Sequence, residues 1–195
     1  KKAKSKLKDR DKIEQYIKLV QSWNKTHNLV SKSQSTNLNE HIQDSLSVLE
    51  HTGGVLVDLG SGGGLPGIPI AIMEPRKQVL LVESSSKKSS FLLNATNKLK
   101  LKNVDVLHSR FEDIDPTNLP VGYEIIARAV GTAEHLIRLS KKHLDRPGTQ
   151  LKLMKTESQL KEESIPHNYV IKKINKIPSK GKDKGRILVT IEKNG

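Results

Sequence analysis

The feature that most constrains the fold is a glycine-rich stretch that follows a short apolar run. Residues 55–69 read Val-Leu-Val-Asp-Leu-Gly-Ser-Gly-Gly-Gly-Leu-Pro-Gly-Ile-Pro, and further apolar residues follow at helical spacing. Glycine takes positive φ readily and lets a ligand approach the backbone, because it has no Cβ. Five glycines within eight residues cost more chain entropy than a plain turn warrants. The sequence therefore predicts a strand, a ligand-binding turn and a helix.

Short apolar runs alternate with helical patterns after this point. The runs lie at residues 55–59, 79–83, 104–108, 123–127 and 150–154. Amphipathic stretches such as 89–99 and 133–144 lie between them. This alternation predicts β-α-β units, and so a parallel sheet with helices on both faces.

The last two apolar runs, 169–174 and 186–192, have no helical pattern between them, and a loop of Pro, Lys and Gly joins them. They are predicted to pair as an antiparallel hairpin at the edge of the sheet. The whole is a mostly parallel, seven-stranded α/β sheet with an antiparallel last strand. This layout resembles that of the class I (Rossmann-like) methyltransferases.

The sequence ahead of the sheet predicts a helical cap. Apolar residues recur at helical spacing over 11–23, and a second amphipathic helix places Ile42, Leu46 and Leu49 inward after the polar stretch 31–39. We expect a single domain over 1–195, with the cap at 1–52 and the α/β fold at 53–195.

Composition narrows the function classes. The chain has 34 Lys and Arg against 21 Asp and Glu, a net charge of +13, concentrated in residues 1–12 and 172–186. Such charge favours a polyanionic partner, most often nucleic acid, although solvated termini and loops are the alternative. The absence of cysteine excludes disulfides, thiolate zinc sites and cysteine nucleophiles. No apolar run is long enough to span a membrane, so a soluble, cytoplasmic protein is expected. No metal site is expected either.

The register of the glycines indicates the class of ligand. Gly62, Gly64 and Gly67 formally match the dinucleotide pattern G-x-G-x-x-G, but Gly62 comes four residues after Asp58, and Pro66 stands at the intended helix start. Asp58, at the strand end, is unfavourable beside a pyrophosphate and favourable beside an ammonium or sulfonium group. S-adenosyl-L-methionine carries both cations, so it is the predicted ligand; an NAD-dependent oxidoreductase is the alternative.

Three later strand ends carry further candidate residues. Glu83 ends the second strand, where its carboxylate can accept both hydroxyl protons of a ribose. Phe111 and Glu112 follow the third strand and are expected to cover the adenine; from spacing alone, a strand-to-loop acid and a core aromatic are the alternative. Arg128 follows the fourth strand, where its planar fork can hold a phosphate, a guanine O6 or the donor's carboxylate. An internal salt bridge to Asp58 or Glu83 is the alternative for Arg128.

From Trp23 onwards these residues resemble a known family, the bacterial small-subunit ribosomal RNA guanine-N7 methyltransferases, or glucose-inhibited division protein B family. The most specific match is the Leu-Pro-Gly-Ile-Pro extension at 65–69. Glu83 stands where Asp is usual, and Lys88 where Arg is usual, which weakens bidentate phosphate recognition. Further matches lie at Trp23-Asn24-Lys25, Asn28-Leu29, His41, Asp44-Ser45-Leu46, Glu83-Ser84, Lys87-Lys88, Phe91-Leu92, Arg110-Phe-Glu112 and Ala127-Arg-Ala129.

The resemblance implies a role for each matching residue. Gly60, Leu65, Phe111 and Glu112 would contact the methyl donor, and Arg128 would lie at the donor and substrate pocket as the catalytic residue. The implied partner is small-subunit ribosomal RNA or the small ribosomal subunit. The full set of predicted site residues is Asp58, Gly60, Gly62, Gly64, Leu65, Glu83, Phe111, Glu112 and Arg128 for the donor, and His41, Lys88 and Arg110 for RNA.

The implied chemistry agrees with what the sequence lacks. Guanine N7 has a lone pair and no proton, so its methylation needs alignment and exclusion of water rather than a general base. The histidines show no metal-ligand spacing, and His108, His135 and His143 are expected to be surface or structural residues. Methylation of another RNA, a protein or a small molecule, and a non-catalytic RNA-binding role, are the alternatives. A monomer is expected.

Overall fold

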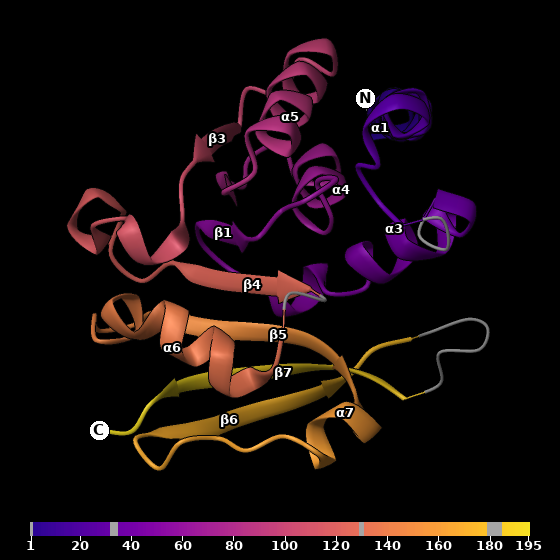
Figure 1. The fold of residues 1–195 in the computed structure, drawn as a ribbon. Helices are drawn as coiled ribbons and strands as arrows, with labels where there is room; N and C mark the ends of the chain where they lie inside the picture. Colours follow the sequence, from indigo (N-terminus) through magenta and orange to yellow (C-terminus); the bar gives the residue numbers. More distant parts are fainter. Residues whose placement is uncertain (1, 32–34, 129–130, 179–184) are drawn as a thin grey trace.

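A seven-stranded sheet forms the centre of the computed structural model, in the order β3-β2-β1-β4-β5-β7-β6 (Figure 1). The structure describes residues 2–31, 35–128, 131–178 and 185–195, with side chains from residue 9 onwards. The strands are β1 (Leu56–Leu59), β2 (Val79–Glu83), β3 (Val104–His108), β4 (Glu124–Arg128), β5 (Gln150–Thr156), β6 (Tyr169–Lys176) and β7 (Arg186–Lys193).

The strand directions confirm the predicted fold class. β1 pairs in parallel with both β2 and β4, and β3 and β5 continue the parallel part on either side. β7 is antiparallel to β5 on one side and to β6 on the other. The reversed strand, β7, therefore lies inside the sheet, and β6 forms the edge of the sheet.

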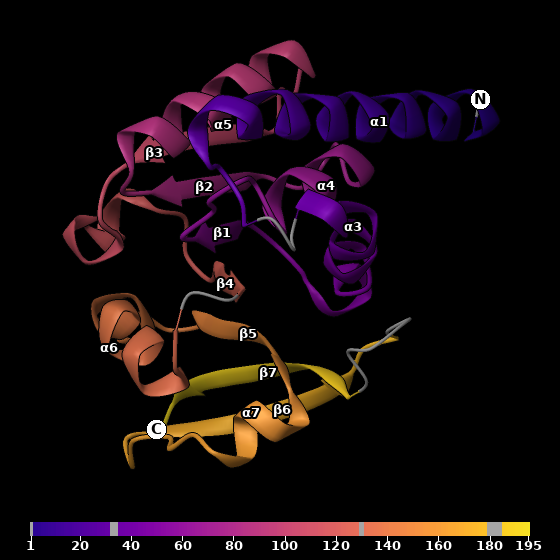
Figure 2. The same cartoon turned by 45° about the vertical axis from the view of Figure 1, so that its right-hand side comes forward.

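Helices cover both faces of the sheet, as predicted (Figures 1 and 2). Neighbouring residues of β1 alternate between two apolar cores: Leu56 belongs to the core beneath α1, α3, α4 and α5, and Val57 to the core beneath α6. The helices are α1 (Lys2–His27), α3 (Leu38–Leu46), α4 (Gly67–Met73), α5 (Ser86–Lys98), α6 (Ala133–Leu144) and α7 (Glu157–Lys161), with short 3-10 helices η1 (Leu49–His51), η2 (Phe111–Asp113) and η3 (Pro116–Asn118).

The first helix is longer than the sequence pattern indicates. It begins at Lys2 rather than at residue 11, because residues 2–10 are rich in Lys and also contain Ala, Leu and Arg, all of which have high helix propensity even where no apolar stripe forms. In the second predicted helix, Ile42 is buried, whereas Leu46 and Leu49 are only half-buried and Leu49 lies in η1. Figure 2 shows α1 lengthwise, beside α5 and α4.

The helical cap packs directly on the glycine loop, here residues 60–66. The Tyr16 side chain is fully buried, and its hydroxyl donates a hydrogen bond to the carbonyl oxygen of Gly63 at 2.6 Å. Burial raises the pKa of Tyr16, and the nearby Asp58 raises it further, so the phenol keeps the proton that it donates. A Cβ on Gly63 would lie 2.6 Å from Val30 Cγ1, so this position has no room for a larger residue.

We predict that Tyr16→Phe lowers the free energy of unfolding by about 1–3 kcal/mol, because the buried Gly63 carbonyl loses its partner. Urea unfolding followed by circular dichroism measures the change. Tyr169→Phe is the matched control: Tyr169 is half-buried, and removing its hydroxyl is expected to change stability by less than about 0.5 kcal/mol. Equal losses in the two variants would contradict this account of Tyr16.

Candidate active site

The glycine loop lies where the carboxyl ends of β1, β2 and β4 meet. Gly60, Gly62 and Gly64 have φ values of +70°, +55° and +92°, the region of positive φ that glycine takes readily. The backbone N–H groups of Gly60 and Ser61 both donate to the carbonyl oxygen of Val82, each at 3.0 Å. The loop is therefore tied to the end of β2, the edge at which ligands of open α/β sheets bind.

Two neighbouring cavities open at this edge, and Gly60 and Ser84 line both of them. The glycine-loop cavity has a volume of about 330 Å³ and is lined by Leu29, Val30, Gly60, Ser61, Gly62, Gly63, Leu65, Glu83, Ser84, Lys88 and Arg128. The aromatic cavity has a volume of about 210 Å³ and is lined by Leu59, Gly60, Val82, Ser84, Ser109, Arg110, Phe111, Glu112, His135 and Leu139. Together they have the size of a small-molecule site.

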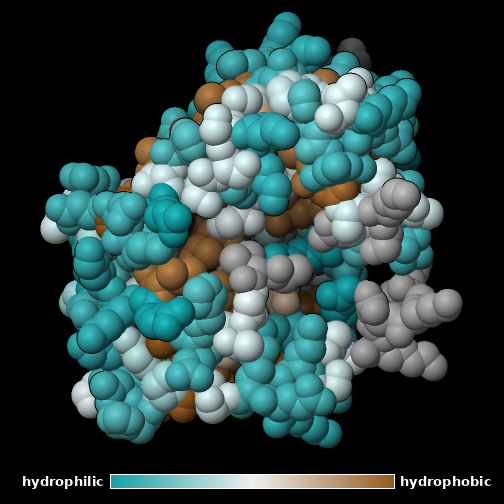
Figure 3. All heavy atoms as spheres, in the orientation of Figure 1, coloured by the Kyte–Doolittle hydropathy of each residue, from teal (hydrophilic) through white to brown (hydrophobic). Residues whose placement is uncertain are grey.

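The surface around this edge combines apolar and polar side chains. Figure 3 shows apolar surface recessed in the middle of the face that Figure 1 presents, with hydrophilic side chains around it. An apolar recess with a few convergent polar groups is typical of a pocket for a small ligand.

Glu83 joins the glycine loop to the start of α5. One carboxylate oxygen accepts from the N–H of Gly62 and the other from the N–H of Ser85, each at 2.8 Å. A carboxylate offers about four lone-pair positions, so each oxygen can still accept one more hydrogen bond. The side chain is 7% exposed and lines the glycine-loop cavity. Its predicted role, to accept from two ribose hydroxyls, fits this geometry.

Arg128 is the last residue of β4 and lines the glycine-loop cavity. Its Nη2 donates to Nδ1 of His41 in α3 at 2.6 Å, which fixes the proton of a neutral His41 on Nε2. Among the described residues, neither Asp58 nor Glu83 forms an ion pair with Arg128, so the alternative of such a salt bridge is wrong. Arg128 is 9% exposed, and its Nε has no hydrogen-bond partner in the described part of the chain.

The charges around Arg128 come from three separate elements. Asp44 of α3 forms an ion pair with Arg186, the first residue of β7, at 3.3 Å. Burial lowers the pKa of Arg128; Asp44 raises it and Arg186 lowers it. His41, Asp44, Arg128 and Arg186 therefore form one polar cluster, here called the arginine cluster. It joins the helical cap to both the parallel and the reversed parts of the sheet.

Asp58 and Gly64 line neither cavity. The Asp58 carboxylate is 1% exposed, and its Oδ2 accepts from the N–H of Gly67 at 2.9 Å, at the start of α4. The other oxygen, Oδ1, has no partner among the described residues. Burial raises the pKa of Asp58 to about 7, against the lowering effect of the Gly67 hydrogen bond. Asp58 therefore supports the glycine loop from below.

Phe111, Glu112 and Arg110 occupy η2 and the position before it. Phe111 is buried and forms a wall of the aromatic cavity. Arg110 is exposed and Glu112 is half-buried, and the two form an ion pair at 4.0 Å. The structure thus places the predicted adenine-covering residues together, on the opposite side of Gly60 from Arg128 and Lys88.

Sequence reasoning missed several residues of this site. Leu29 and Val30 line the glycine-loop cavity from the segment that follows α1, and His135 and Leu139 line the aromatic cavity from α6. Tyr16 was recognised only as part of an apolar stripe. Only Leu29 and Ser84 had a local signal, since both lie within family-like motifs.

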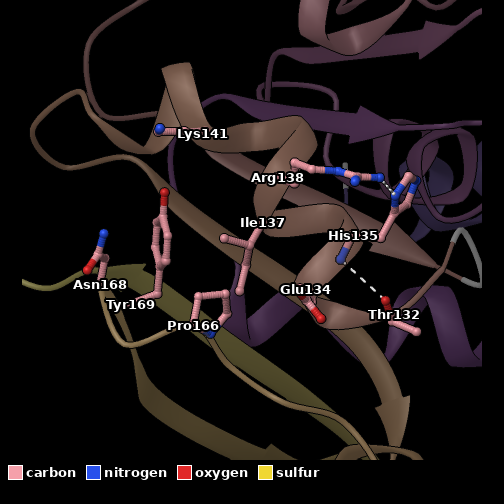
Figure 4. A pocket seen from close by; sticks show the side chains of 9 residues that line it. All are labelled: Thr132, Glu134, His135, Ile137, Arg138, Lys141, Pro166, Asn168 and Tyr169. Atoms are coloured by element: carbon pink, nitrogen blue, oxygen red, sulfur yellow. Dashed lines mark hydrogen bonds between the residues drawn. The ribbon is translucent and has the colours of Figure 1, made fainter.

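A third cavity, of about 460 Å³, lies between α6 and the start of β6 (Figure 4). It contains no residue of the glycine loop and no predicted site residue, and it shares His135 with the aromatic cavity. Figure 4 shows Arg138 reaching toward His135, whose Nδ1 accepts from Nη2 at 2.9 Å. Its size does not make it the reaction centre, because the converging polar groups lie at the sheet edge.

Two further findings concern metals and membranes. In the described part of the chain, no group of three or more His, Cys, Asp or Glu side chains could hold a metal ion. No described helix is both long and apolar enough to cross a membrane.

The sheet order and the glycine loop after β1 define the class I methyltransferase fold. A SAM dependent methyltransferase from Aquifex aeolicus is 18% identical, with a TM-score of 0.56 and coverage of 87% of this chain and 97% of that chain. TrmK of M. capricolum, solved with S-adenosyl-homocysteine, is 15% identical, with a TM-score of 0.54 and coverage of 77% of this chain and 67% of that chain. At these identities the likeness concerns the fold alone.

Sequence comparison gives the family within this class. Residues 9–185 match the GidB family, described as rRNA small subunit methyltransferase G. The ribosomal RNA small subunit methyltransferase G of Hydrogenovibrio crunogenus is 36% identical over 187 residues, which cover 93% of this chain and 84% of that protein. The chain belongs to this family, which confirms the resemblance found in its motifs.

We predict that the stability difference between the wild type and Asp58→Asn depends on pH. The pKa of Asp58 is about 7 in the folded state and about 3.9 when unfolded, so the folded state keeps a proton that the unfolded state releases. Stability is therefore full below the unfolded value and is lost as pH rises through about 7, by at most about 1.4 kcal/mol per pH unit. The amide introduced by Asp58→Asn does not titrate, so this variant lacks the slope.

Urea unfolding of both proteins from about pH 5 to about pH 8 measures the difference. A difference that stays constant across this window would contradict the buried, protonated state of Asp58.

Proposed function

We propose that this protein transfers a methyl group from S-adenosyl-L-methionine to N7 of a guanine in small-subunit ribosomal RNA. It is an enzyme of the methyltransferase class, and its substrate is ribosomal RNA, as the family description and the curated relatives state. The observation that carries the proposal is the wall of Gly60 and Ser84 between two cavities, with Arg128 on one side and Phe111 on the other.

The residues present fit the methyl donor. The glycine loop offers backbone at positive φ without side chains, and Glu83 retains acceptor capacity for two ribose hydroxyls. Phe111 provides an apolar wall for an adenine ring, next to the half-buried Glu112. When bound, the donor supplies a methyl group activated by a positively charged sulfur. Leu65 and Gly62 would border it in the glycine-loop cavity.

Asp58 keeps a supporting part in this proposal. Its carboxyl group lies beneath the loop rather than in a cavity, and its pKa of about 7 leaves it only partly ionised near neutral pH, so it does not contact a cationic ligand directly. Its hydrogen bond to the N–H of Gly67 fixes where the loop ends, and Gly64 shapes the loop without lining a cavity.

The chemistry asks for alignment rather than proton transfer. The guanine N7 lone pair would form the new C–N bond, the bonding electrons of the donor's S–C bond would stay on sulfur, and no proton would have to leave N7. The chain therefore has to hold the base in line and exclude water. Arg128 is placed for this task, because its guanidinium is held by His41 beside the glycine loop and can donate to a guanine O6 or a carboxylate.

The RNA would approach over the basic residues at the mouth of the site. Lys88 of α5 lines the glycine-loop cavity, and Arg110 lines the aromatic cavity. Farther from the site, at the edge of the sheet, β6 carries the exposed Lys172, Lys173 and Lys176, of which Lys172 pairs with Glu192 and Lys176 with Glu157. Such residues give sequence-independent attraction to phosphates that weakens as salt rises.

One assay tests the acceptor. Small ribosomal subunits that lack the modification are incubated with the protein and methyl-labelled donor, and the labelled base is then mapped. The expected product is 7-methylguanosine in the small-subunit RNA. Label in another RNA, in a protein or in no product would contradict the proposal and favour one of the alternative acceptors or a non-catalytic role.

We predict that Arg128→Ala lowers kcat/KM for methyl transfer by at least about 100-fold, because the acceptor loses its positioning group. The variant is expected to keep its circular dichroism spectrum. Arg76→Ala is the control, since Arg76 is exposed and precedes β2, away from the site, and it should retain full activity. Normal turnover by Arg128→Ala would refute this role.

We predict that Lys88→Ala raises KM for the ribosomal subunit by about three- to tenfold and reduces the salt dependence of binding, with little change in donor affinity. Lys98→Ala removes the same charge from the last residue of α5 and should leave KM within about twofold of the wild type. The measurement is KM at two or more salt concentrations. Equal effects of the two substitutions would show that only net charge matters.

A further inference from the structure

His143 of α6 is a fully buried histidine that the proposed reaction does not use. Its ring stacks on Phe111, with the ring centroids 4.1 Å apart and the planes inclined by 21°. Its Nε2 lies 3.3 Å from the carbonyl oxygen of Phe111, and its Nδ1 lies in hydrogen-bond contact with the hydroxyl of Tyr123. One imidazole thus touches both the ring and the backbone of Phe111.

The partners fix the proton of His143. The Phe111 carbonyl can only accept, so Nε2 must carry the proton and donate it. Nδ1 of the neutral ring then accepts from the Tyr123 hydroxyl. Burial lowers the pKa of His143 and raises that of Tyr123 to about 12, so the neutral ring and the intact phenol agree with this arrangement.

Tyr123 is itself held in place. It is fully buried beside the start of β4, and the guanidinium of Arg146 lies 6.0 Å from its ring centroid. Arg146 donates to the carbonyl oxygens of Pro116 and Leu119, in the segment that follows η2. The contacts therefore connect Tyr123, which directly precedes β4, through His143 to Phe111 in the wall of the aromatic cavity.

The chemistry of this arrangement exceeds what packing requires. A buried leucine could fill a similar volume, but it would remove the acceptor Nδ1 that faces the Tyr123 hydroxyl and the side-chain donor to the Phe111 carbonyl, which would keep its bond from the backbone N–H of Ile114. Phe111 is the first residue of η2, which is only a single turn of 3-10 helix. Little local structure therefore fixes its ring. The side of Phe111 that does not face His143 is free to form the cavity wall.

We propose that His143 is a positioning residue for the methyl donor: it holds the ring and the carbonyl of Phe111, and so sets the surface against which a purine ring packs in the aromatic cavity. This inference rests on the proposed function, because it takes the adenine of the donor as the occupant of that cavity. His143 acts through Phe111 and contacts no reacting atom.

The test is calorimetric titration of S-adenosylhomocysteine into the full chain. His143→Phe keeps an aromatic ring but removes the hydrogen bonds to Phe111 and Tyr123. It should raise the dissociation constant about tenfold. His143→Gln retains an N–H donor that can reach the Phe111 carbonyl. It should raise the dissociation constant clearly less, by about threefold. KM for the ribosomal subunit should stay near the wild-type value in both variants.

A control separates positioning from loss of stability. Leu151→Ala truncates a fully buried side chain of β5. Leu151 belongs to the apolar core that also contains Phe111, and it lines none of the three cavities. It should lower the unfolding midpoint at least as much as His143→Phe while leaving the dissociation constant within about twofold of the wild type. Tyr123→Phe, which removes only the hydroxyl, should weaken binding less than His143→Phe.

The outcomes distinguish the two levels of the argument. If the wild type itself does not bind S-adenosylhomocysteine, the proposed function fails. If the wild type binds and His143→Phe binds equally well, only the role of His143 is overturned. The same holds if Leu151→Ala weakens binding as much as His143→Phe, or if His143→Gln is no better than His143→Phe. Should His143→Phe not fold, His143→Gln and Tyr123→Phe decide, and wild-type affinity in both would overturn the role.

Discussion

The site depends on how the backbone of residues 60–67 is held at the end of β1. Three side chains from three elements fix it: Glu83 accepts from Gly62, Tyr16 donates to Gly63, and Asp58 accepts from Gly67. Glycine leaves the backbone of this loop more conformational freedom than other residues do. The three hydrogen bonds restrain that freedom and hold the loop in one conformation. Both cavities then take their shared wall from the first residue of this loop.

The helical cap is part of the site rather than an appendage. α1 buries Tyr16 against the loop, and α3 presents His41 to Arg128 and Asp44 to Arg186. The arginine cluster therefore places the buried Arg128 cation beside the glycine-loop cavity, and Asp44 of the cap lies close enough to favour its charged form. A buried charge is costly unless it is paired, so this arrangement couples the placement of the cap to that of the reaction centre.

Much of the fold follows from sequence patterns. β2, β3 and α6 have the predicted bounds, because these strands read as short apolar runs between turn residues and an amphipathic helix shows its period. Glu83, Phe111 and Arg128 could be placed at the ligand edge, because strand ends in a parallel sheet share one side. The start of α1 was missed because a basic run without an apolar stripe carries no periodic signal. The reversed strand was expected, and its place inside the sheet came only from the pairing of β7 with β5.

The sequence by itself determined the class of fold, the ligand-binding turn and the family, since these depend on local spacing and on motifs. Tertiary structure alone decided the partners that make the site rigid. Tyr16 and Gly63 are 47 residues apart, and His41 and Arg128 are 87 apart. His143 looked like an unremarkable surface or structural histidine, and only packing placed it against Phe111. Such contacts arise where separate elements meet, and local periodicity holds no information about which side chains then face each other.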